Sequence, residues 1–439
     1  MIATLEQACV PRPSVFDPSV RDTVYNIDDL DQIDPRQFFA ENYVTQGMRQ
    51  LLSEAFARLE GKSQSASGAF LLSQSMGGGK THNLLALGLL AKHPALRQQV
   101  MGDFYQPGSL GAVRVVTFSG RRTNTPYGLW GEIAGQLNRH ETFREFYAPL
   151  RPPGDRDWIT LLSGDPILIM LDELPPYFQA AQAIEVGSTT LDVITTTALA
   201  NLLVAVSSGK LPNACVVLTD LRGSAYGVGS QRISAALQDL EREANRSVHR
   251  IDPVRLNSDE LYHILRTRLF ATLPTQTEIE AVADAYARVI DDARRTDHTT
   301  ASPQHFRAEI ISAYPFHPAI RDLYARFREN PGFQQTRALI RLMRIVVAHL
   351  WRSHAARHKY LIGAHDLDLH DSDVISEIRQ INGTFDNAIA HDIASEGGTA
   401  VAEKIDGPNR TDAQDAAKLI LMSSLSQAVN PTLGLDRSS

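Results

Sequence analysis

The first 255 residues alternate between short apolar runs and stretches in which apolar residues recur at a helical spacing. The helical stretches include residues 82–93 and an apolar, Thr-rich helix expected at residues 189–207. The apolar runs, which predict buried strands, lie at residues 69–72, 111–119, 166–171, 213–220 and 247–254. Strands separated by helices are typical of a parallel sheet that is covered by helices on both faces. The pattern therefore predicts an α/β domain over residues 41–255, after an extended Asp- and Pro-rich segment at residues 1–40.

From residue 256 onward, helical spacing replaces the strand-like runs. Residues 256–360 are predicted to form a second, all-α domain, which contains one long helix at residues 337–358. The looser pattern at residues 361–439 predicts a C-terminal helical or irregular segment. An apolar helix lies close to the end of that segment, which suggests that it begins a further region of a longer protein.

Composition and charge narrow the class of protein. The 439 residues are 43% hydrophobic and 21% charged, which is ordinary for a soluble globular protein. A formal net charge of -7 gives no global signal for nucleic acid, although a local basic face remains compatible with it. Cys9 and Cys215 are the two cysteines, too few for a disulfide framework or a zinc site. With no signal peptide and no apolar run near the ~20 residues that span a membrane, we expect a cytoplasmic protein without a membrane partner.

The chain is organised around the stretch that follows the first predicted strand, SQSMGGGKTHN. A strand, a glycine-rich loop, Lys-Thr and a helix in this order are typical of a P-loop, whose backbone N–H groups surround phosphates at a helix N-terminus. Lys80 would reach the β- and γ-phosphates of ATP, and the Thr81 hydroxyl would bind Mg²⁺. The residues expected to bind the nucleotide are Ser75, Met76, Gly77, Gly78, Gly79, Lys80, Thr81 and His82. Gln74 stands where the general pattern has glycine, and the alternative is a glycine-rich surface loop that happens to end in Lys-Thr.

Two later strands end in polar residues that could serve the same nucleotide. The strand at residues 166–171 leads into Asp172 and Glu173, and ligands of open α/β sheets bind at the carboxyl ends of strands. Asp172 would hold Mg²⁺, usually through the water shell of the ion, and Glu173 would polarise the attacking water as a general base. The next strand ends in Thr219 and Asp220, which could lie near the γ-phosphate. The alternative for the Asp-Glu pair is an acidic strand end without a catalytic role.

The order of these motifs, followed by an arginine-bearing helix and a helical domain, resembles the AAA+ branch of the P-loop ATPases over about residues 40–360. Within that span, SQSMGGGKTHNLLALGLLAKHP, ILIMLDELPPYF and YPFHPAIRDLYARF resemble a family of large bacterial ATPases found in anti-phage islands. Those proteins are often known only as a domain of unknown function, and they look related to the BrxC and PglY ATPases of BREX phage-defence systems. The resemblance implies an ASCE-type, AAA+-like parallel sheet followed by an all-α lid.

The resemblance also implies roles for single residues. Lys80 and Thr81 match Walker A, Asp172 and Glu173 match Walker B, and Thr219, or Asp220 one position later, matches the polar sensor on the fourth strand. Three arginines match catalytic or sensing positions. Arg242 or Arg246 stands where AAA+ proteins carry the finger that reaches a neighbouring subunit, and Arg337 resembles the second sensor of the lid.

The helix that begins near Arg337 allows other interpretations. Arg337, Arg341 and Arg344 are spaced at i, i+4 and i+7 and are therefore expected on one helix face. This face could be a solvated stripe, it could sense the γ-phosphate through its first arginine, or it could contact nucleic acid. For Arg242, Arg246 and Arg337 alike, the alternative to a catalytic role is an ordinary surface charge.

Together these features predict an ATPase that uses ATP and Mg²⁺ and acts as a motor or switch in a bacterial anti-phage defence complex. An arginine finger acting in trans would make it a homo-oligomer, with other defence-system proteins, and DNA directly or through them, as further partners. The main alternative is a translocase or helicase acting directly on DNA, although Asp-Glu-Leu-Pro is not a helicase box. A nucleotide-holding scaffold and a small-molecule kinase are less well supported, because a scaffold needs no Glu173 and no acceptor pocket can be named.

Overall fold

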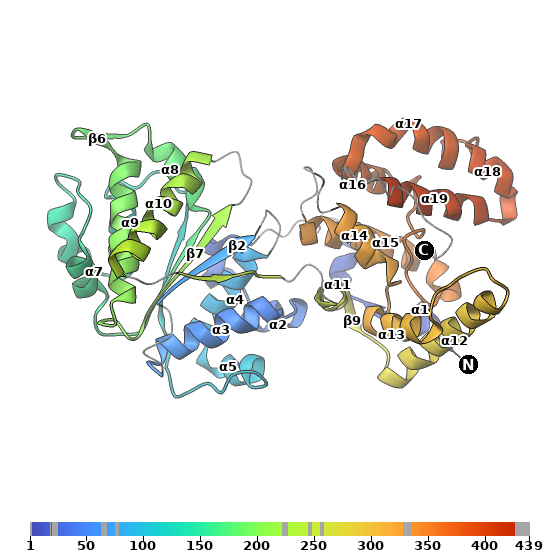
Figure 1. The fold of residues 1–439 in the computed structure, drawn as a ribbon, viewed down its shortest axis with the longest axis horizontal. Helices are drawn as coiled ribbons and strands as arrows, with labels where there is room; N and C mark the ends of the chain where they lie inside the picture. The colour runs from blue at the N-terminus through green and yellow to red at the C-terminus, as the bar shows by residue number, and fades with distance from the viewer. Residues whose placement is uncertain are drawn as a thin grey trace. The chain divides into compact units, whose positions relative to one another are not determined.

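The computed structural model describes residues 2–17, 19, 25–62, 68–74, 79–221, 227–244, 248–254, 259–327, 330 and 335–425 (Figure 1). The chain divides into two compact units. One unit, which we call the sheet unit, comprises residues 24–255. The other, the helical unit, combines residues 1–23 with residues 256–439. Residues 1–23 therefore belong to the same unit as the C-terminal part of the chain.

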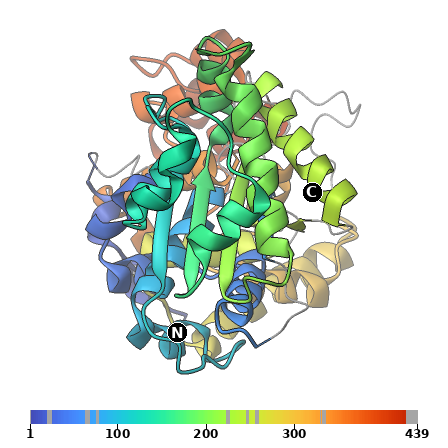
Figure 2. The ribbon, with the colours of Figure 1, turned by 90° about the vertical axis from the view of Figure 1, so that its left-hand side faces the viewer.

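A five-stranded sheet is the centre of the sheet unit, and Figure 2 shows its strands side by side with helices packed around them. In spatial order the strands are β3 (Arg114–Ser119), β4 (Ile167–Asp172), β7 (Ala214–Leu221), β2 (Ala69–Gln74) and β8 (His249–Ile251). All neighbouring pairs in this sheet are parallel. The prediction of a parallel sheet flanked by helices is confirmed, and each of the five predicted strands is present.

Strand β4 shows why a continuous apolar run was the signal for these strands. All six of its residues are buried. Ile167, Ile169 and Leu171 belong to the core on one face of the sheet, and Leu168 and Met170 belong to the core on the other. A strand covered on both faces needs apolar residues at odd and even positions alike, because successive side chains point to opposite faces.

Different helices supply the two cores of the sheet unit. The first core contains residues of α6 (Gly128–Gln136), α7 (Asp155–Leu162), α8 (Leu174–Ala181), α9 (Leu191–Ser207) and α10 (Gly227–Ala244). The second contains residues of η3 (Ile27–Gln32), α2 (Pro35–Glu41), α3 (Gln46–Leu59), α4 (Lys80–Lys92) and α5 (Pro94–Met101). The sheet unit is thus a three-layer structure with α4, the helix after the glycine-rich stretch, in the second helical layer. A short 3₁₀ helix, η4 (His140–Phe146), and a hairpin of β5 (Glu185–Val186) and β6 (Thr189–Thr190) complete the unit.

The N-terminal 40 residues differ from the extended segment predicted for them. They contain α1 (Leu5–Ala8), β1 (Val10–Pro11), η1 (Pro13–Val15), η3 and most of α2. Asp34 caps α2 by accepting hydrogen bonds from the next turn, and Pro35 occupies its first position. Asp and Pro favour helix starts as well as extended chain, so the composition of this segment did not distinguish the two.

The helical unit is built on one large apolar core that runs from Leu5 to Leu425. Its helices are α11 (Glu260–Leu269), α12 (Gln276–Arg295), α13 (Pro303–Ala313), α14 (Ala319–Phe327), α15 (Gln335–Arg352), η5 (Ala355–His358), α16 (Ser372–Asn382), η6 (Gly383–Phe385), α17 (Asp386–Ala388), η7 (Ile389–Ile393), α18 (Val401–Asp406), η8 (Gly407–Asn409) and α19 (Asp412–Ser424). The predicted helix at 337–358 is divided, because α15 ends at Arg352 and His354 has a left-handed backbone before η5 begins.

The all-α description of this unit needs a correction. Strand β1 pairs antiparallel with β9 (Phe270–Thr272), so the unit also contains a two-stranded sheet. Its two strands are some 260 residues apart in the sequence, and each is too short to give a periodic pattern of its own. The N-terminal segment is further attached to the unit by Glu6, which pairs with Arg357 of η5 at 2.6 Å.

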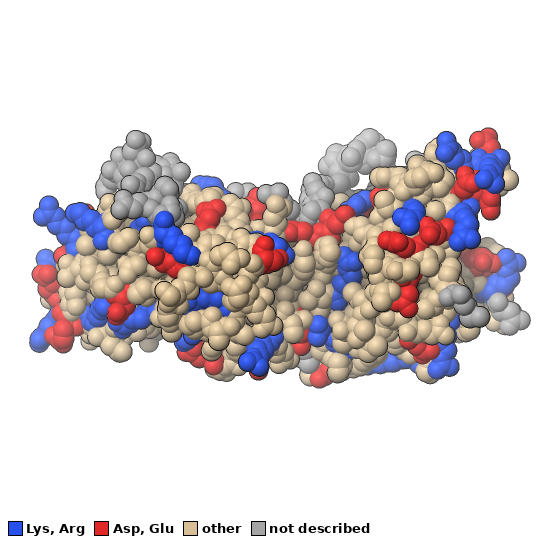
Figure 3. Space-filling model, turned by 90° about the horizontal axis from the view of Figure 1, so that it is seen from below, with Lys and Arg blue, Asp and Glu red and all other residues tan. Residues whose placement is uncertain are grey.

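The surface is mixed in charge on the face drawn in Figure 3, where basic and acidic side chains are interspersed. Within the described residues, no helix combines the length and apolar character needed to cross a membrane.

The buried Arg58 side chain binds three backbone carbonyl oxygens beside the first core. These hydrogen bonds lead to a prediction about stability. The Arg58 guanidinium donates to the carbonyl oxygens of Val206 at 2.6 Å, Leu211 at 2.5 Å and Ala214 at 3.2 Å. Arg58→Met would leave these carbonyls without that donor, and we expect the free energy of unfolding to fall by about 3 kcal/mol or more in urea titrations. Arg49→Met is the control, because Arg49 makes a surface ion pair with Asp103, and we expect a loss below about 1 kcal/mol. Equal losses in the two variants would contradict this role of Arg58.

Candidate active site

Five of the predicted site residues lie at one edge of the five-stranded sheet, namely Lys80, Thr81, Asp172, Glu173 and Thr219. Because all its strands are parallel, the carboxyl ends of β2, β7 and β4 lie together at that edge. Strand β7 lies between β2, which leads to the glycine-rich stretch, and β4, which ends in Asp172. A residue near the carboxyl end of β7 is thus placed between the two motifs, and Thr219, two residues before the end of the strand, occupies such a position.

Asp172 is the centre of a hydrogen-bonded network that joins three elements. Its Oδ2 accepts a hydrogen bond from the Thr81 hydroxyl of α4 at 2.8 Å. Its Oδ1 accepts one from the Thr219 hydroxyl of β7 at 2.6 Å. The residue is 4% exposed, and this burial raises the pKa of Asp172, an effect that the two threonine hydroxyls and the positive charge of Lys80 oppose. The carboxylate is therefore fixed in place by partners on both of its oxygens.

Glu173 is placed by its backbone. Its N–H donates to the Thr219 hydroxyl oxygen at 2.9 Å, and its φ of 49° and ψ of 44° lie in the left-handed region. This turn ends β4 and starts α8 at Leu174. A non-glycine residue in this conformation costs free energy and is a frequent feature of functional sites.

Gly120, directly after β3, accommodates that turn. A Cβ at position 120 would lie 2.0 Å from the Glu173 carbonyl oxygen, so a side chain would collide with the Glu173 backbone. The Gly120 N–H also donates to the Asp172 carbonyl oxygen at 2.8 Å. The end of β3 is thus held directly against the end of β4.

The Glu173 carboxylate is engaged by an arginine whose role the sequence analysis missed. Arg121 Nε donates to Glu173 Oε2 at 2.7 Å. The next residue, Arg122, pairs with Asp28 of η3 at 2.9 Å instead. The sequence does contain a pair of arginines immediately after a predicted strand. Their contact with Glu173 could not be predicted, because the sequence does not show that β3 lies next to β4 in the sheet.

The described part of the glycine-rich stretch is its junction with α4. Gly79 has a φ of 83° and is the N-cap of the helix. The Asn83 side chain donates to the Gly79 carbonyl oxygen at 2.9 Å, which fixes this left-handed turn. Lys80, the first helical residue, is 6% exposed, and the first turn of α4 carries no acidic residue. No acidic side chain of that turn offsets the positive end of the helix, which favours an anion there.

Several predicted site residues lie wholly or partly outside the described structure. Ser75, Met76, Gly77, Gly78 and Arg246 are outside the described residues. Asp220 lies in β7, Gln74 in β2 and Arg242 in α10, but their side chains are not among those described. Of the predicted set, the structure brings together Lys80, Thr81, Asp172, Glu173 and Thr219.

The arginines of α15 lie in the helical unit and differ in their surroundings. Arg337 is half-buried near the helix start, and Arg341 pairs with Glu377 of α16 at 3.2 Å. Arg344 is 2% exposed, so the interpretation of this face as a solvated stripe is wrong for its third member.

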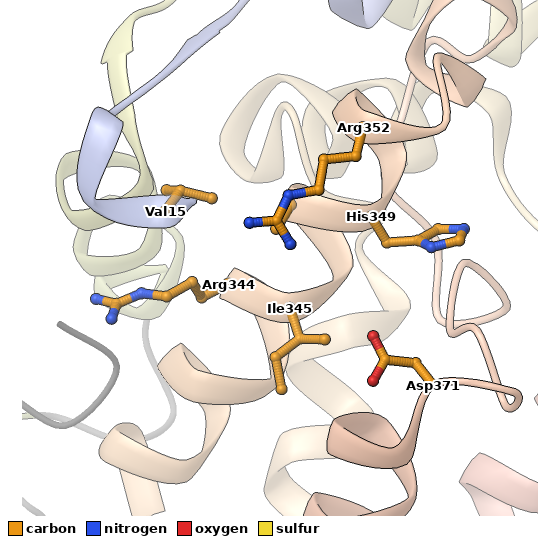
Figure 4. Close-up of a pocket in the computed structure, with 7 residues that line it drawn as sticks. Val15, Arg344, Ile345, His349, Arg352 and Asp371 are labelled. Atoms are coloured by element: carbon orange, nitrogen blue, oxygen red, sulfur yellow. The ribbon is translucent and has the colours of Figure 1, made fainter. Parts of the chain in front are cut away.

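Arg344 borders a pocket of about 150 Å³ within the helical unit. Figure 4 shows the Arg352 and Asp371 side chains beside it, and Arg352 also donates to the Phe16 carbonyl oxygen at 2.7 Å. The residues that line the pocket are Val15, Arg344, Ile345, Ala348, His349, Arg352 and Asp371. Arg337 and Arg341 are not among these residues, so Arg344 alone of the three arginines lines this pocket.

The oxygens of Thr81 and Asp172 are suitable ligands for Mg²⁺. Mg²⁺ prefers hard oxygen ligands at about 2.1 Å in octahedral geometry, in which neighbouring ligands lie roughly 3 Å apart. Thr81 Oγ1 and Asp172 Oδ2 are 2.8 Å apart, close to that spacing. The described residues contain no group of three His, Cys, Asp or Glu side chains that could hold a metal. A magnesium ion at this edge would thus depend on one carboxylate, one hydroxyl, and phosphate or water oxygens.

Two family models match the chain. Residues 14–101 match the DUF499 N-terminal domain, and residues 257–428 match the DUF499 second domain. The chain is therefore similar to the DUF499 family over these two ranges. The first range includes β2, Lys80 and Thr81, whereas Asp172, Glu173 and Thr219 lie between the two ranges. No curated protein sequence matches the chain.

The buried carboxylate leads to a pH-dependent prediction. Because burial raises the pKa of Asp172, the free energy of unfolding falls as the pH rises from the ordinary carboxyl pKa of the unfolded chain to the raised pKa, and the loss is complete above it. We expect Asp172→Asn to be more stable than the wild type at pH 8, on the order of 1 kcal/mol, in urea titrations. The difference should shrink as the pH falls and the folded wild type binds a proton at this site. Asp165→Asn, at a largely exposed carboxylate, should show no such trend, and a variant less stable than wild type at pH 8 would contradict the argument.

Proposed function

We propose that the protein is a magnesium-dependent ATPase of the AAA+ type that acts as a motor or switch. The observation that carries the proposal is the convergence of the Thr81 and Thr219 hydroxyls on the buried Asp172 carboxylate, with Glu173 as the next residue. Burial of a carboxylate costs free energy, and residues of this kind are frequent at functional sites. A buried carboxylate between a helix start that carries a lysine and a second carboxylate suits the binding of a magnesium-bound triphosphate.

Each residue of the network has a defined part in hydrolysis. Lys80 would neutralise the β- and γ-phosphates, while Thr81 and Asp172 would hold Mg²⁺. Mg²⁺ would supply positive charge to the phosphate oxygens as the γ-phosphoryl group is transferred. Glu173 would accept a hydrogen bond from the attacking water. Thr219 contacts Asp172 through its hydroxyl hydrogen and the Glu173 backbone through its oxygen, so it would fix the base relative to the metal ligand.

The strand order supports the ASCE division of the P-loop proteins. A strand inserted between the P-loop strand and the strand that bears the acidic pair is typical of the ASCE division, to which AAA+ proteins belong. In this chain β7 occupies that place and contributes the polar residue Thr219. The helical unit that follows in sequence would correspond to the lid.

The finer parts of the proposal rest on the resemblance. Arg242 or Arg246 would be the finger that completes the site of a neighbouring protomer, and Arg337 would sense the γ-phosphate. The similarity to DUF499 over two ranges is compatible with a role in a defence complex, because the resembling ATPases of anti-phage islands are often known only as a domain of unknown function. DNA would be contacted directly or through partner proteins.

Two variants test the proposed activity. Lys80→Ala should abolish ATP binding in isothermal titration calorimetry, because the phosphates lose their buried cation. Glu173→Gln should bind Mg·ATP like the wild type but lower turnover by about 10² or more, because the base is lost while the backbone turn is kept. Turnover is followed as phosphate release over a protein concentration series, with and without DNA, so that dependence on assembly is seen in the same assay. Micromolar affinity in Lys80→Ala, or near-normal turnover in Glu173→Gln, would refute the proposal.

The Arg121–Glu173 contact gives a second prediction. Arg121 occupies Glu173 Oε2, an oxygen that would otherwise be open to the attacking water, so we expect Arg121→Ala to raise basal turnover several-fold. Arg122→Ala is the matched control, since the neighbouring guanidinium pairs with Asp28 and should leave turnover within about twofold. Lower turnover in Arg121→Ala would show that the arginine positions Glu173 productively instead of restraining it.

A further inference from the structure

Three aromatic side chains of the sheet unit meet beside the first turn of α4. The His82 ring, next in sequence to Thr81, lies 5.6 Å from the Tyr25 ring in an edge-to-face arrangement. It also stacks against Phe38 of α2, with 6.0 Å between ring centroids. Tyr25 and Phe38 are themselves 5.8 Å apart. We call these three residues the aromatic cluster.

The members of the cluster differ in exposure. Phe38 is 1% exposed and belongs to the core between the sheet and its second helical layer. Tyr25 and His82 are only partly buried. The cluster therefore has a fixed inner ring and two outer rings that keep surface open to solvent, the form needed for a flat ligand to stack on them.

The segment that carries Tyr25 is firmly held. Immediately after it, Asn26 caps η3 by accepting a hydrogen bond from the Asp28 N–H at 3.2 Å. Ile27 is 1% exposed, and Asp28 pairs with Arg122 at 2.9 Å. A ring on an anchored segment loses little conformational freedom when a ligand stacks on it.

The direction of a bound nucleotide follows from the site already described. The γ-phosphate end must face Lys80, Asp172 and Glu173, so the α-phosphate, ribose and base must extend away from β4. On α4, Thr81 faces Asp172, whereas His82, about 100° further around the helix, faces Tyr25 and Phe38. The aromatic cluster thus lies on another flank of the helix start than the catalytic carboxylates.

We propose that Tyr25 and His82 form a platform on which the base of the nucleotide stacks, with Phe38 as its rigid support. This inference rests on the proposed ATPase function, because it takes the position of the phosphates from it. The ligand is a purine nucleotide, recognised by the π-face of its base. Stacking of this kind does not read the edge of the base, so the contribution of the platform is similar for adenine and guanine.

The experiment compares ligands with and without a base. Dissociation constants for ATP, ADP, GTP and inorganic triphosphate are measured by calorimetry in the wild type, Tyr25→Ala and His82→Ala. We expect each variant to bind ATP, ADP and GTP roughly tenfold more weakly, while its affinity for inorganic triphosphate stays within twofold of wild type. Tyr25→Phe should restore nucleotide affinity, because the ring remains. Tyr127→Ala, which removes an exposed tyrosine elsewhere in the unit, should change nothing.

The outcomes separate the platform from the proposed function. If the wild type binds neither ATP nor triphosphate, the ATPase proposal itself fails. If the wild type binds both and the two alanine variants bind ATP normally, the platform is refuted while the phosphate site stands. If the alanine variants weaken triphosphate and ATP equally, the cluster only maintains the fold around the loop, and the platform is again refuted. Thermal unfolding of each variant shows whether a general loss of stability accompanies the change.

Discussion

The structure of this site depends on one constraint, the burial of the Asp172 carboxylate. Burial of a carboxylate is costly unless its oxygens accept hydrogen bonds. Here one donor is Thr81 at the start of α4, and the other is Thr219 of β7, the strand beside β4. The network can form only if β7 lies beside β4 and α4 begins at Lys80. The strand order, the start of the helix and the position of Thr219 therefore satisfy one electrostatic requirement together. The burial that this network serves raises the pKa of Asp172, so ionisation of the carboxylate opposes folding.

The neighbouring Glu173 is controlled in a different way. Its backbone turn is fixed by the Thr219 hydroxyl and by the close approach of Gly120, whereas its carboxylate is bound by the partly exposed Arg121. The position of the residue is thus set by buried contacts, and the direction of its side chain is set by a contact that water and ligands can reach. Such a division allows the side chain to be released without a rearrangement of the sheet, as a switch would require.

The sequence predicted what depends on local pattern and missed what depends on contacts between distant segments. The six buried residues of β4 produce a continuous apolar run, and the residues after the strands β4 and β7 were placed at one edge by parallel topology alone. By contrast, the pairing of β1 with β9 and the contact between Arg121 and Glu173 join segments that carry no pattern in common. The burial of Arg344 was also beyond helical periodicity, which shows that three arginines share a face but not which part of that face is covered. In the N-terminal segment the Asp-Pro pairs were ambiguous, since the same residues cap a helix and favour extended chain.

The two halves of the proposed nucleotide site are connected through two adjacent residues. Arg121 binds the Glu173 carboxylate, and Arg122 binds Asp28 in the segment that carries Tyr25. Both arginines follow Gly120, whose backbone is held against the end of β4. A movement of this short loop would therefore act on the base-side segment and on Glu173 at the same time. The contacts of these two arginines thus connect the Tyr25 segment with Glu173 within one unit of the chain.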